Sequence, residues 1–400
     1  MAIHAGVGLS KIEDAREAGS EATKEALTAA GIDRADVVIV FASVAFNQEE
    51  LIAGIREASG TALIVGCTDA GEITSVGPSQ KSVALMVIQS DVIRFKGGLG
   101  PNIKNGAREA GQSVARSVRE AAEEPLRSFI MFPDVLAGNG ADTVRGVLDV
   151  LGEHFPVVGG APGDDFLFQK TYQYLNDEVT SGAVGGLGLS GKFSMGIGVR
   201  HGWMPIGMPM KVTKAEGAVL HELDGRPAIS IYEDYFGERA KELRKEALAR
   251  MAITYPIGLK IPEYTDEYLI RDPITVDEHG AITCAAEVPE GSEVRLMIGS
   301  REKAIDAAKE AAQHMMHEFE MDHAQPKFVL MFNCIAREKL YGARANEEIQ
   351  AVLDVIGRTT PLLGFYTYGE QAPLGGEVRD REKCSSRFYN ETMVLFGVGE

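Results

Sequence analysis

The chain is poor in the features that mark metal-binding, disulfide-bonded or membrane proteins. Its four cysteines, Cys67, Cys284, Cys334 and Cys384, are scattered without any CxxC pair, which argues against a zinc ribbon and a disulfide framework. No apolar run approaches the length of a membrane span, and the N-terminus lacks a basic region followed by an apolar core. No cluster of Lys and Arg offsets the net charge of −18, so we expect neither a nucleic-acid nor a membrane partner. The sequence therefore predicts a cytoplasmic protein.

In other respects the composition is that of an ordinary globular protein. Apolar residues make up 45% of the chain and charged residues 24%. A chain of 400 residues is long enough for two domains, each with its own core. We expect the crossing between them near the prolines and glycine of residues 205–209, which gives domains at residues 1–210 and 211–400.

A glycine-rich motif occurs once in each half of the chain. The first copy is Gly66-Cys67-Thr68-Asp69-Ala70-Gly71-Glu72 and the second is Gly364-Phe365-Tyr366-Thr367-Tyr368-Gly369-Glu370. Each copy follows a short apolar run typical of a strand, and its glycines allow the backbone to approach a small ligand closely. The alternative is a tight turn between two strands. Because the outline occurs twice, we expect a shared role.

A second internal similarity joins the middle of the chain to its end. Residues 146–160 (GVLDVLGEHFPVVGG) align without gaps on residues 351–365 (AVLDVIGRTTPLLGF), which indicates a duplicated unit. Each unit reads as a strand, a loop, an amphipathic helix closed by glycine, and a second strand. The expected opening strands are Val37–Phe41, Phe129–Phe132 and Phe328–Phe332, and the expected helices are Gln48–Ser59, Asp142–Leu151 and Glu347–Ile356. The sequence therefore predicts an α/β fold of two domains with mixed sheets, built from repeated βαβ units.

Local signals place the ends of several other helices. Ser10 and Glu13 form an expected capping box for a helix that ends at Gly31, and Asn47 with Glu50 caps the next one. Residues 228–250 are predicted to be largely helical.

Residues 183–189 and 193–200 read as two strands of a hairpin. Residues 186–191 match GxGxxG, and residues 186–192 match most of a P-loop. Both motifs need a helix to begin at this point, whereas the continuation FSMGIGV alternates like a strand. We therefore predict no nucleotide site here.

Two pairs of side chains could carry chemistry at the strand ends. Cys67 and Cys334 each follow a strand, where a nucleophile could stand, but no His or Asp lies at a spacing that would activate a thiolate. Glu72 and Glu370 could exchange protons, although a carboxylate after glycine in a turn more often caps a neighbouring amide. We therefore expect no enzyme activity, with a thiol-dependent hydrolase as the alternative.

The histidines give no clear metal site. His201 lies at an expected strand end beside Trp203, and the alternative to a functional role is a structural histidine. His314 and His317 lie on an expected helix opposite its apolar face, so we predict that both face solvent.

Taken together, these motifs resemble the FIST proteins, which pair a FIST N and a FIST C sensory domain in bacterial signal transduction. The resemblance covers nearly the whole chain. In the first half it rests on the Gly66–Glu72 motif, Val158-Gly159-Gly160, Asp164-Asp165 and His201-Gly202-Trp203. In the second half it rests on Leu223-Asp224-Gly225-Arg226-Pro227, Phe332-Asn333-Cys334, Arg337, the Gly364–Glu370 motif and Phe388-Tyr389-Asn390-Glu391-Thr392.

The resemblance implies a sensor that binds a small molecule, with amino acids as the proposed class. No kinase, cyclase or chemotaxis module is evident in this sequence, so we expect the signal to pass to a separate protein such as a histidine kinase or a cyclase. Some family members are reported as haem proteins that sense nitric oxide, which gives an alternative function. We expect no cofactor, and His201 is the first candidate if haem is bound.

The predicted ligand site lies mainly in the second half, because its motifs offer both charges, amides, hydroxyls and aromatic walls. We expect Arg337 or Glu370 to point into the pocket, and the first-half motif to serve mainly as a structural counterpart. The alternative location is around His201 and Trp203. The predicted ligand-binding residues are Asn333, Cys334, Arg337, Gly364, Tyr366, Thr367, Tyr368, Gly369, Glu370 and Asn390, together with Gly66, Cys67, Thr68, Gly71 and Glu72.

Overall fold

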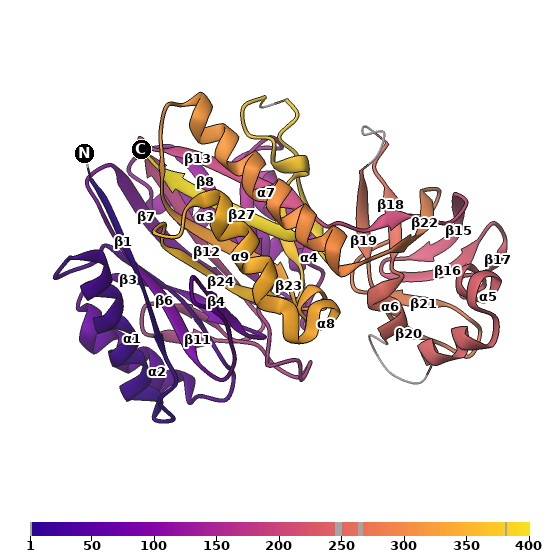
Figure 1. Cartoon of the computed structure of the whole chain (residues 1–400), viewed down its shortest axis with the longest axis horizontal. Helices are drawn as coiled ribbons and strands as arrows, with labels where there is room; N and C mark the ends of the chain where they lie inside the picture. Colours follow the sequence, from indigo (N-terminus) through magenta and orange to yellow (C-terminus); the bar gives the residue numbers. More distant parts are fainter. Residues whose placement is uncertain (1, 245–249, 263–266, 381) are drawn as a thin grey trace.

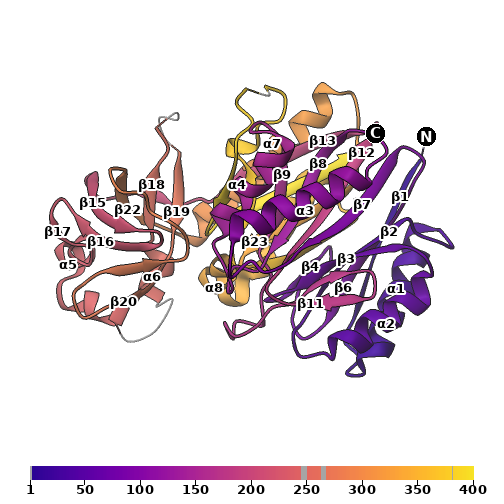
Figure 2. The ribbon, with the colours of Figure 1, turned by 180° about the vertical axis from the view of Figure 1, so that it is seen from behind.

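Three similar units form a body, and a separate β-domain is inserted into the third unit (Figure 1). The computed structural model describes residues 2–244, 250–262, 267–380 and 382–400. The chain leaves the body near residue 203 and returns near residue 300, so the inserted domain projects to one side of the body in both views (Figures 1 and 2). The fold is α/β with mixed sheets, as the sequence predicts.

Each unit has the same order of elements: strand, helix, strand, helix, strand and a closing strand, with the second helix divided in two in the third unit. The first unit comprises β1 (Ile3–Ser10), α1 (Ala15–Ala30), β2 (Val37–Ala42), α2 (Gln48–Ser59), β3 (Leu63–Thr68) and β6 (Val83–Ser90). The second comprises β7 (Ile93–Gly100), α3 (Ala107–Ala121), β8 (Leu126–Pro133), α4 (Gly140–Leu151), β9 (Val157–Gly160) and β12 (Val184–Gly191). The third comprises β13 (Ser194–Arg200), α7 (Arg301–Met321), β23 (Pro326–Cys334), α8 (Ile335–Tyr341), α9 (Ala345–Ile356), β24 (Leu362–Thr367) and β27 (Met393–Gly399).

The pairing within the three sheets is also the same. The orders β1-β6-β2-β3, β7-β12-β8-β9 and β13-β27-β23-β24 each place the closing strand between the first and second strands. The second and third strands are parallel in every unit. The predicted repeat of a βαβ unit is therefore confirmed, and the aligned segments 146–160 and 351–365 adopt the same secondary structure.

The three units are joined by an exchange of hairpins. After its third strand each unit sends a short hairpin to the sheet of another unit. The hairpin β4–β5 (Glu72–Thr74 and Gly77–Ser79) extends β24, β10–β11 (Gln173–Leu175 and Glu178–Thr180) extends β3, and β25–β26 (Glu370–Pro373 and Ser386–Tyr389) extends β9. Because each unit completes the sheet of another, we expect the body to fold as one cooperative structure.

The sheets pack around an aromatic centre to which each unit contributes an equivalent residue. Phe41, Phe132 and Phe332 come from β2, β8 and β23, and Phe365 on β24 lies among them. All four rings are buried, and ring centroids lie 4.3 Å apart for Phe41–Phe365 and 5.7 Å apart for Phe41–Phe132. The strands on which they lie are apolar on both faces because helices cover one side and this centre covers the other.

The inserted domain is mainly β-structure. Its strands are β14 (Met204–Pro205), β15 (Met210–Glu216), β16 (Val219–Leu223), β17 (Arg226–Pro227), β18 (Ile257–Lys260), β19 (Tyr268–Arg271), β20 (Pro273–Val276), β21 (Ile282–Cys284) and β22 (Glu293–Ile298). Its helices are α5 (Ser230–Phe236), a 3-10 helix (Gly237–Arg244) and α6 (Arg250–Thr254). The prediction of a largely helical segment at 228–250 is borne out over 230–244, and residues 245–249 lie outside the described chain.

Two local predictions are wrong. The segments 183–189 and 193–200 are strands, and no helix begins between them, but they do not form a hairpin: β12 lies beside β8, whereas β13 pairs with β27. The first helix is capped by Asp14, whose side chain accepts a hydrogen bond from the Glu17 amide at 2.9 Å, and not by Ser10. The predicted cap at Asn47 and the helix end at Gly31 are confirmed.

In space the chain divides differently from the two predicted segments, 1–210 and 211–400. The strand β13 precedes residue 210, yet it lies in one sheet with β23, β24 and β27. The inserted domain occupies the interval between β13 and α7. The structural boundary thus falls within the third unit.

Candidate functional site

The two glycine-rich motifs are strand-turn-strand segments. Gly66 and Gly364 lie inside β3 and β24, where a side chain would collide with the neighbouring strand: a Cβ would meet the carbonyl oxygen of Val40 at 1.8 Å and that of Met331 at 2.2 Å. The glycines therefore serve close strand packing. The predicted alternative of a tight turn is what the structure contains. The two turns lie against each other, since the amide of Ala70 donates to the Tyr366 carbonyl at 3.0 Å.

The glutamates that end the two motifs cap backbone amides. Glu72 accepts hydrogen bonds from the amide and hydroxyl of Ser82, and the equivalent Glu370 accepts from the Thr392 amide at 3.2 Å and from the Thr367 hydroxyl. Burial raises the pKa of Glu72 to about 7 and the pKa of Glu370 well above its usual range. Neither carboxyl is free to bind an amine in this structure.

Arg337 and Asn333 share one buried partner. Both side chains contact the carboxylate of Glu348, with the Asn333 amide at 2.7 Å and the Arg337 Nε at 2.8 Å. Arg337 also donates to the carbonyls of His201 and Ala304. Its side chain is completely buried. Burial alone would lower the pKa of Arg337, but the neighbouring carboxylate of Glu348 raises it above the ordinary value.

The remaining motif residues are distributed through the core. Cys67 is buried in the main hydrophobic cluster, and the Thr68 hydroxyl accepts from the Tyr172 amide at 2.9 Å. Gly71 packs against Tyr366, and the carbonyl of Gly369 accepts from Ala161 at 2.7 Å.

Three predicted residues do meet at a cavity. Cys334, Tyr368 and Asn390 line a small space of about 50 Å³ between the body and the inserted domain. Phe168 covers it by stacking on Tyr368, with ring centroids 4.6 Å apart. Burial and the nearby Glu370 raise the pKa of the Cys334 thiol well above normal, and burial and Asp69 do the same for Cys67. A nucleophilic cysteine needs the opposite shift.

We therefore predict that Cys67→Ala and Cys334→Ala preserve the ligand response. Both changes remove a buried sulfur without breaking a hydrogen bond needed for chemistry, so only a modest stability loss is expected. Calorimetry of both variants, with an amino acid that binds the unchanged protein, measures whether the affinity is preserved. Loss of an assayed turnover in one variant that keeps its fold would instead support the thiol-dependent hydrolase.

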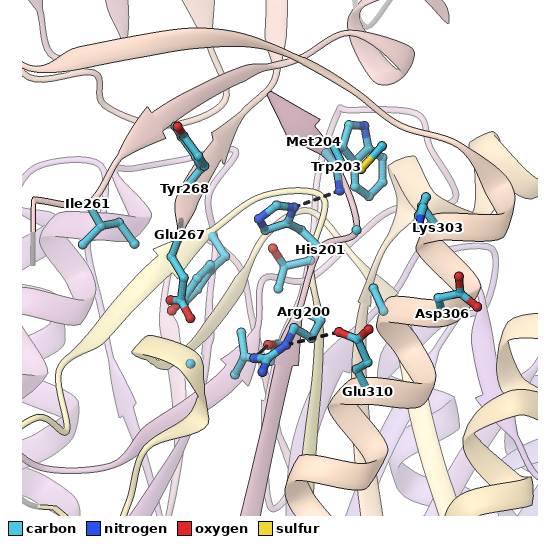
Figure 3. A pocket seen from close by; sticks show the side chains of 16 residues that line it. Arg200, His201, Trp203, Met204, Ile261, Glu267, Tyr268, Lys303, Asp306 and Glu310 are labelled. Carbon is cyan, nitrogen blue, oxygen red and sulfur yellow. Dashed lines mark hydrogen bonds and ion pairs between the residues drawn. The ribbon is translucent and has the colours of Figure 1, made fainter. Parts of the chain in front are cut away.

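A larger cavity lies where the chain crosses between the body and the inserted domain; we call it the crossing cleft (Figure 3). Its volume is about 330 Å³. Body residues from the end of β13 and the first turns of α7 form one side, and residues of the inserted domain around β19 form the other. The lining residues are Val199, Arg200, His201, Gly202, Trp203, Met204, Ile261, Glu267, Tyr268, Lys303, Asp306, Ala307, Glu310, Gly375, Tyr389 and Thr392.

Charged groups of both signs line the crossing cleft. Lys303, Asp306 and Glu310 lie along one exposed face of α7, because residues three and four apart share a helix face. Arg200 rises from the end of β13, with its Nε 3.8 Å from a Glu310 carboxylate oxygen. Figure 3 shows Glu267 extending from the inserted domain on the side opposite α7. The cleft can thus contact an anionic and a cationic group of one ligand.

His201 is held at the cleft by its neighbours. The Trp203 amide donates to the Nδ1 of His201 at 3.0 Å, which places the imidazole proton on Nε2. Burial, together with the positive charges of Arg337 and Arg200, lowers the pKa of His201 to about 4. The histidine is therefore neutral at physiological pH.

This arrangement does not fit a haem ligand. A histidine that binds iron through Nε2 normally donates its Nδ1 proton to an acceptor, whereas here Nδ1 faces the Trp203 N–H. Charged side chains also occupy the walls where a porphyrin would need apolar surface. Among the described residues, no group of three or more His, Cys, Asp and Glu side chains is placed to hold a metal ion.

The two histidines of α7, His314 and His317, differ in their exposure to solvent. His317 faces solvent as predicted, but His314 is half-buried, with its Nδ1 3.2 Å from the carbonyl oxygen of Ile197. The prediction for His314 is wrong because β13 packs against that side of α7.

No helix in the described part of the chain is both long and apolar enough to cross a membrane.

Sequence reasoning missed most of the crossing cleft. It named the neighbourhood of His201 and Trp203 as the alternative location, but not Lys303, Asp306, Glu310 or Glu267. The charged stripe on α7 was a usable signal, because its spacing places three charges on one face.

Together these features define an α/β protein with three repeated units, an inserted β-domain and a charged cleft between the two parts. Profiles of the FIST N domain and the FIST C domain match residues 36–226 and 228–373, so the chain belongs to the FIST family. Domains of this family are associated with the sensing of small ligands in signal transduction.

Relatives of known sequence include several uncharacterized proteins. One from Mycobacterium tuberculosis is 27% identical over 390 residues, which is 93% of this chain and 95% of that protein. One from Methanocaldococcus jannaschii is 22% identical over 385 residues, or 90% of this chain and 69% of that protein. Their descriptions give no activity.

Two solved structures show a distant likeness to the chain. A cyanuric acid hydrolase from A. caulinodans aligns with a TM-score of 0.38 and 8% identity, over 99% of each chain. A chorismatase aligns with a TM-score of 0.37 and 7% identity, over 100% of each chain. Both scores are too low to establish a common fold.

Proposed function

We propose that this chain is a cytoplasmic small-molecule sensor whose ligand binds in the crossing cleft. The observation that carries the proposal is the position of the cleft at the two points where the chain passes between body and inserted domain. A ligand there would contact both parts at once. Membership of the FIST family supports a sensory role.

The lining favours an amino-acid-like zwitterion. Arg200 and Lys303 can donate hydrogen bonds to a ligand carboxylate, while Glu267 and Asp306 can accept hydrogen bonds from a ligand ammonium group. Tyr268 offers an aromatic wall. The volume of about 330 Å³ lies at the lower end of the range for small-molecule sites, roughly 300–1,000 Å³.

The signal would follow from the two-sided contact. A ligand that bonds to both parts adds contacts that exist only while the inserted domain sits against the body, so binding favours that arrangement. A separate protein, such as a histidine kinase or a cyclase, would read the change. The proposal includes no catalytic step, no cofactor, and no nucleic-acid or membrane partner.

Calorimetry with the twenty L-amino acids tests the proposal. We expect at least one to bind, and Arg200→Gln and Glu267→Gln to weaken that binding by roughly 10- to 100-fold, as loss of a charge-assisted hydrogen bond implies. Arg358→Gln is a matched control, because Arg358 is exposed just beyond the C-terminal end of α9 and pairs with Asp354.

Unchanged affinity in both cleft variants would place the ligand elsewhere.

A further inference from the structure

A second large cavity lies between the inserted domain and the second unit of the body. Its volume is about 540 Å³, and it is lined from α4, from β26 and from the hairpin β18–β19. Four arginines reach it: Arg108, Arg145, Arg271 and Arg387. Apolar side chains, including that of Leu269, form much of the remaining wall.

Arg271 differs from the other three arginines because it is buried and forms no ion pair with any residue that the structure describes. Its residue is 3% exposed. The Nε donates to the Glu287 carbonyl at 2.8 Å, and Nη1 donates to the carbonyls of Ile270 at 2.9 Å and Phe388 at 3.4 Å. Within the described residues, Nη2 donates to no acceptor and no carboxylate lies within ion-pair distance of the guanidinium. Burial of this charge lowers the pKa of Arg271 to about 10.

The acidic groups of the cavity are engaged by the other arginines. Arg145 forms ion pairs with Asp142 and Glu287, both at 2.6 Å, and Arg108 forms one with Asp149 at 2.6 Å. Glu153 and Arg387 also line the cavity, and both are exposed. The charge left to face the interior of the cavity is therefore the guanidinium of Arg271.

We propose that this cavity binds a small organic anion. A carboxylate or phosphate head group would accept from the Nη2 of Arg271 and from Arg387, since a planar guanidinium matches either group. An apolar portion would lie against Leu148 and Leu269. Binding supplies the missing countercharge, and the volume lies within the range of small-molecule sites.

This site is distinct from the crossing cleft but shares a wall with it. Successive side chains of a strand point to opposite faces, so Tyr268 of β19 lines the crossing cleft while Leu269 and Arg271 line the second cavity. A ligand in either cavity would hold the same hairpin.

Three probes test the proposal by calorimetry on the full chain: phenyl phosphate, benzoate and inorganic phosphate. We expect saturable binding of phenyl phosphate or benzoate at one site, weakened by added NaCl because the contact is ionic. Phenyl phosphate should bind more tightly than inorganic phosphate, because its ring can lie against the apolar wall of the cavity. The two organic probes show which head group is preferred.

Variants then locate the site. Arg271→Met should reduce the affinity at least tenfold, and Arg387→Gln should reduce it several-fold without affecting the buried core. Arg358→Gln and Arg200→Gln should leave it unchanged, and the latter separates this site from the proposed zwitterion site. Absence of saturable binding by all three probes would overturn the inference. So would unchanged affinity in Arg387→Gln, a readout that remains valid if Arg271→Met fails to fold.

Discussion

Replacing Arg337 with alanine should lower the free energy of unfolding by about 3–5 kcal/mol, the cost of leaving one partner of a buried ion pair uncompensated. Arg337 and Glu348 are both fully buried, and Glu348 also accepts hydrogen bonds from Asn333 and Tyr341. Without the guanidinium, the Glu348 carboxylate keeps only these two neutral partners. The Ala304 carbonyl at the start of α7 also loses a donor.

Urea denaturation followed by circular dichroism measures this loss. Arg344→Ala is the matched control, because Arg344 forms an exposed ion pair with Glu347 in the same region. We expect the control to be nearly neutral, as exposed pairs contribute little. Equal losses in both variants would contradict a structural role for Arg337.

Gly54→Ala should destabilise the protein by about 1–3 kcal/mol, although alanine is the better helix former by about 1 kcal/mol. Gly54 lies within α2, where a Cβ would come 2.0 Å from the carbonyl oxygen of Arg16 on α1. The equivalent Gly146 on α4 meets the Arg108 carbonyl oxygen at the same distance of 2.0 Å. In the first and second units the glycine lets two helices pack with their backbones in contact.

If helix propensity alone decided the effect at position 54, Gly54→Ala would stabilise the protein instead. Ala58→Gly in the same helix is the control, since it should cost up to about 1 kcal/mol through propensity. Thermal unfolding of the two variants provides the comparison. A more stable Gly54→Ala protein would show that the helices are not in close contact.

The repeated unit could be predicted from the sequence because its signals are local. A gap-free match between two segments fixes the same order of strand and helix, and Asn47 and Gly31 mark helix ends through hydrogen bonds to nearby residues. Such signals need no knowledge of distant partners.

The connection of the units could not be predicted, because it depends on pairing between distant segments. The exchanged strands β4, β10 and β25 contain only three or four residues each. Short strands carry little pattern of their own. The strand β13 was assigned to its sequence neighbour β12, whereas its true partner β27 lies at the other end of the chain.

The candidate site shows the same limit. The motifs Gly66–Glu72 and Gly364–Glu370 were predicted to surround a ligand, but burial in the exchanged sheets explains their glycines and glutamates. Arg337 was predicted to face the ligand and instead lies behind the cleft wall, bonded to the His201 carbonyl. The charges on α7 matter only because the inserted domain forms the opposite side of the cleft from that helix face.

Amide hydrogen exchange, measured with and without the amino acid selected by calorimetry, tests the central claim most directly. The claim is that a ligand in the crossing cleft joins the body to the inserted domain. We predict slower exchange at residues 200–204, 267–268 and 303–310, which contain the residues on the two sides of the cleft. Slower exchange confined to residues 333–337 and 364–370, with no change at the cleft, would contradict it.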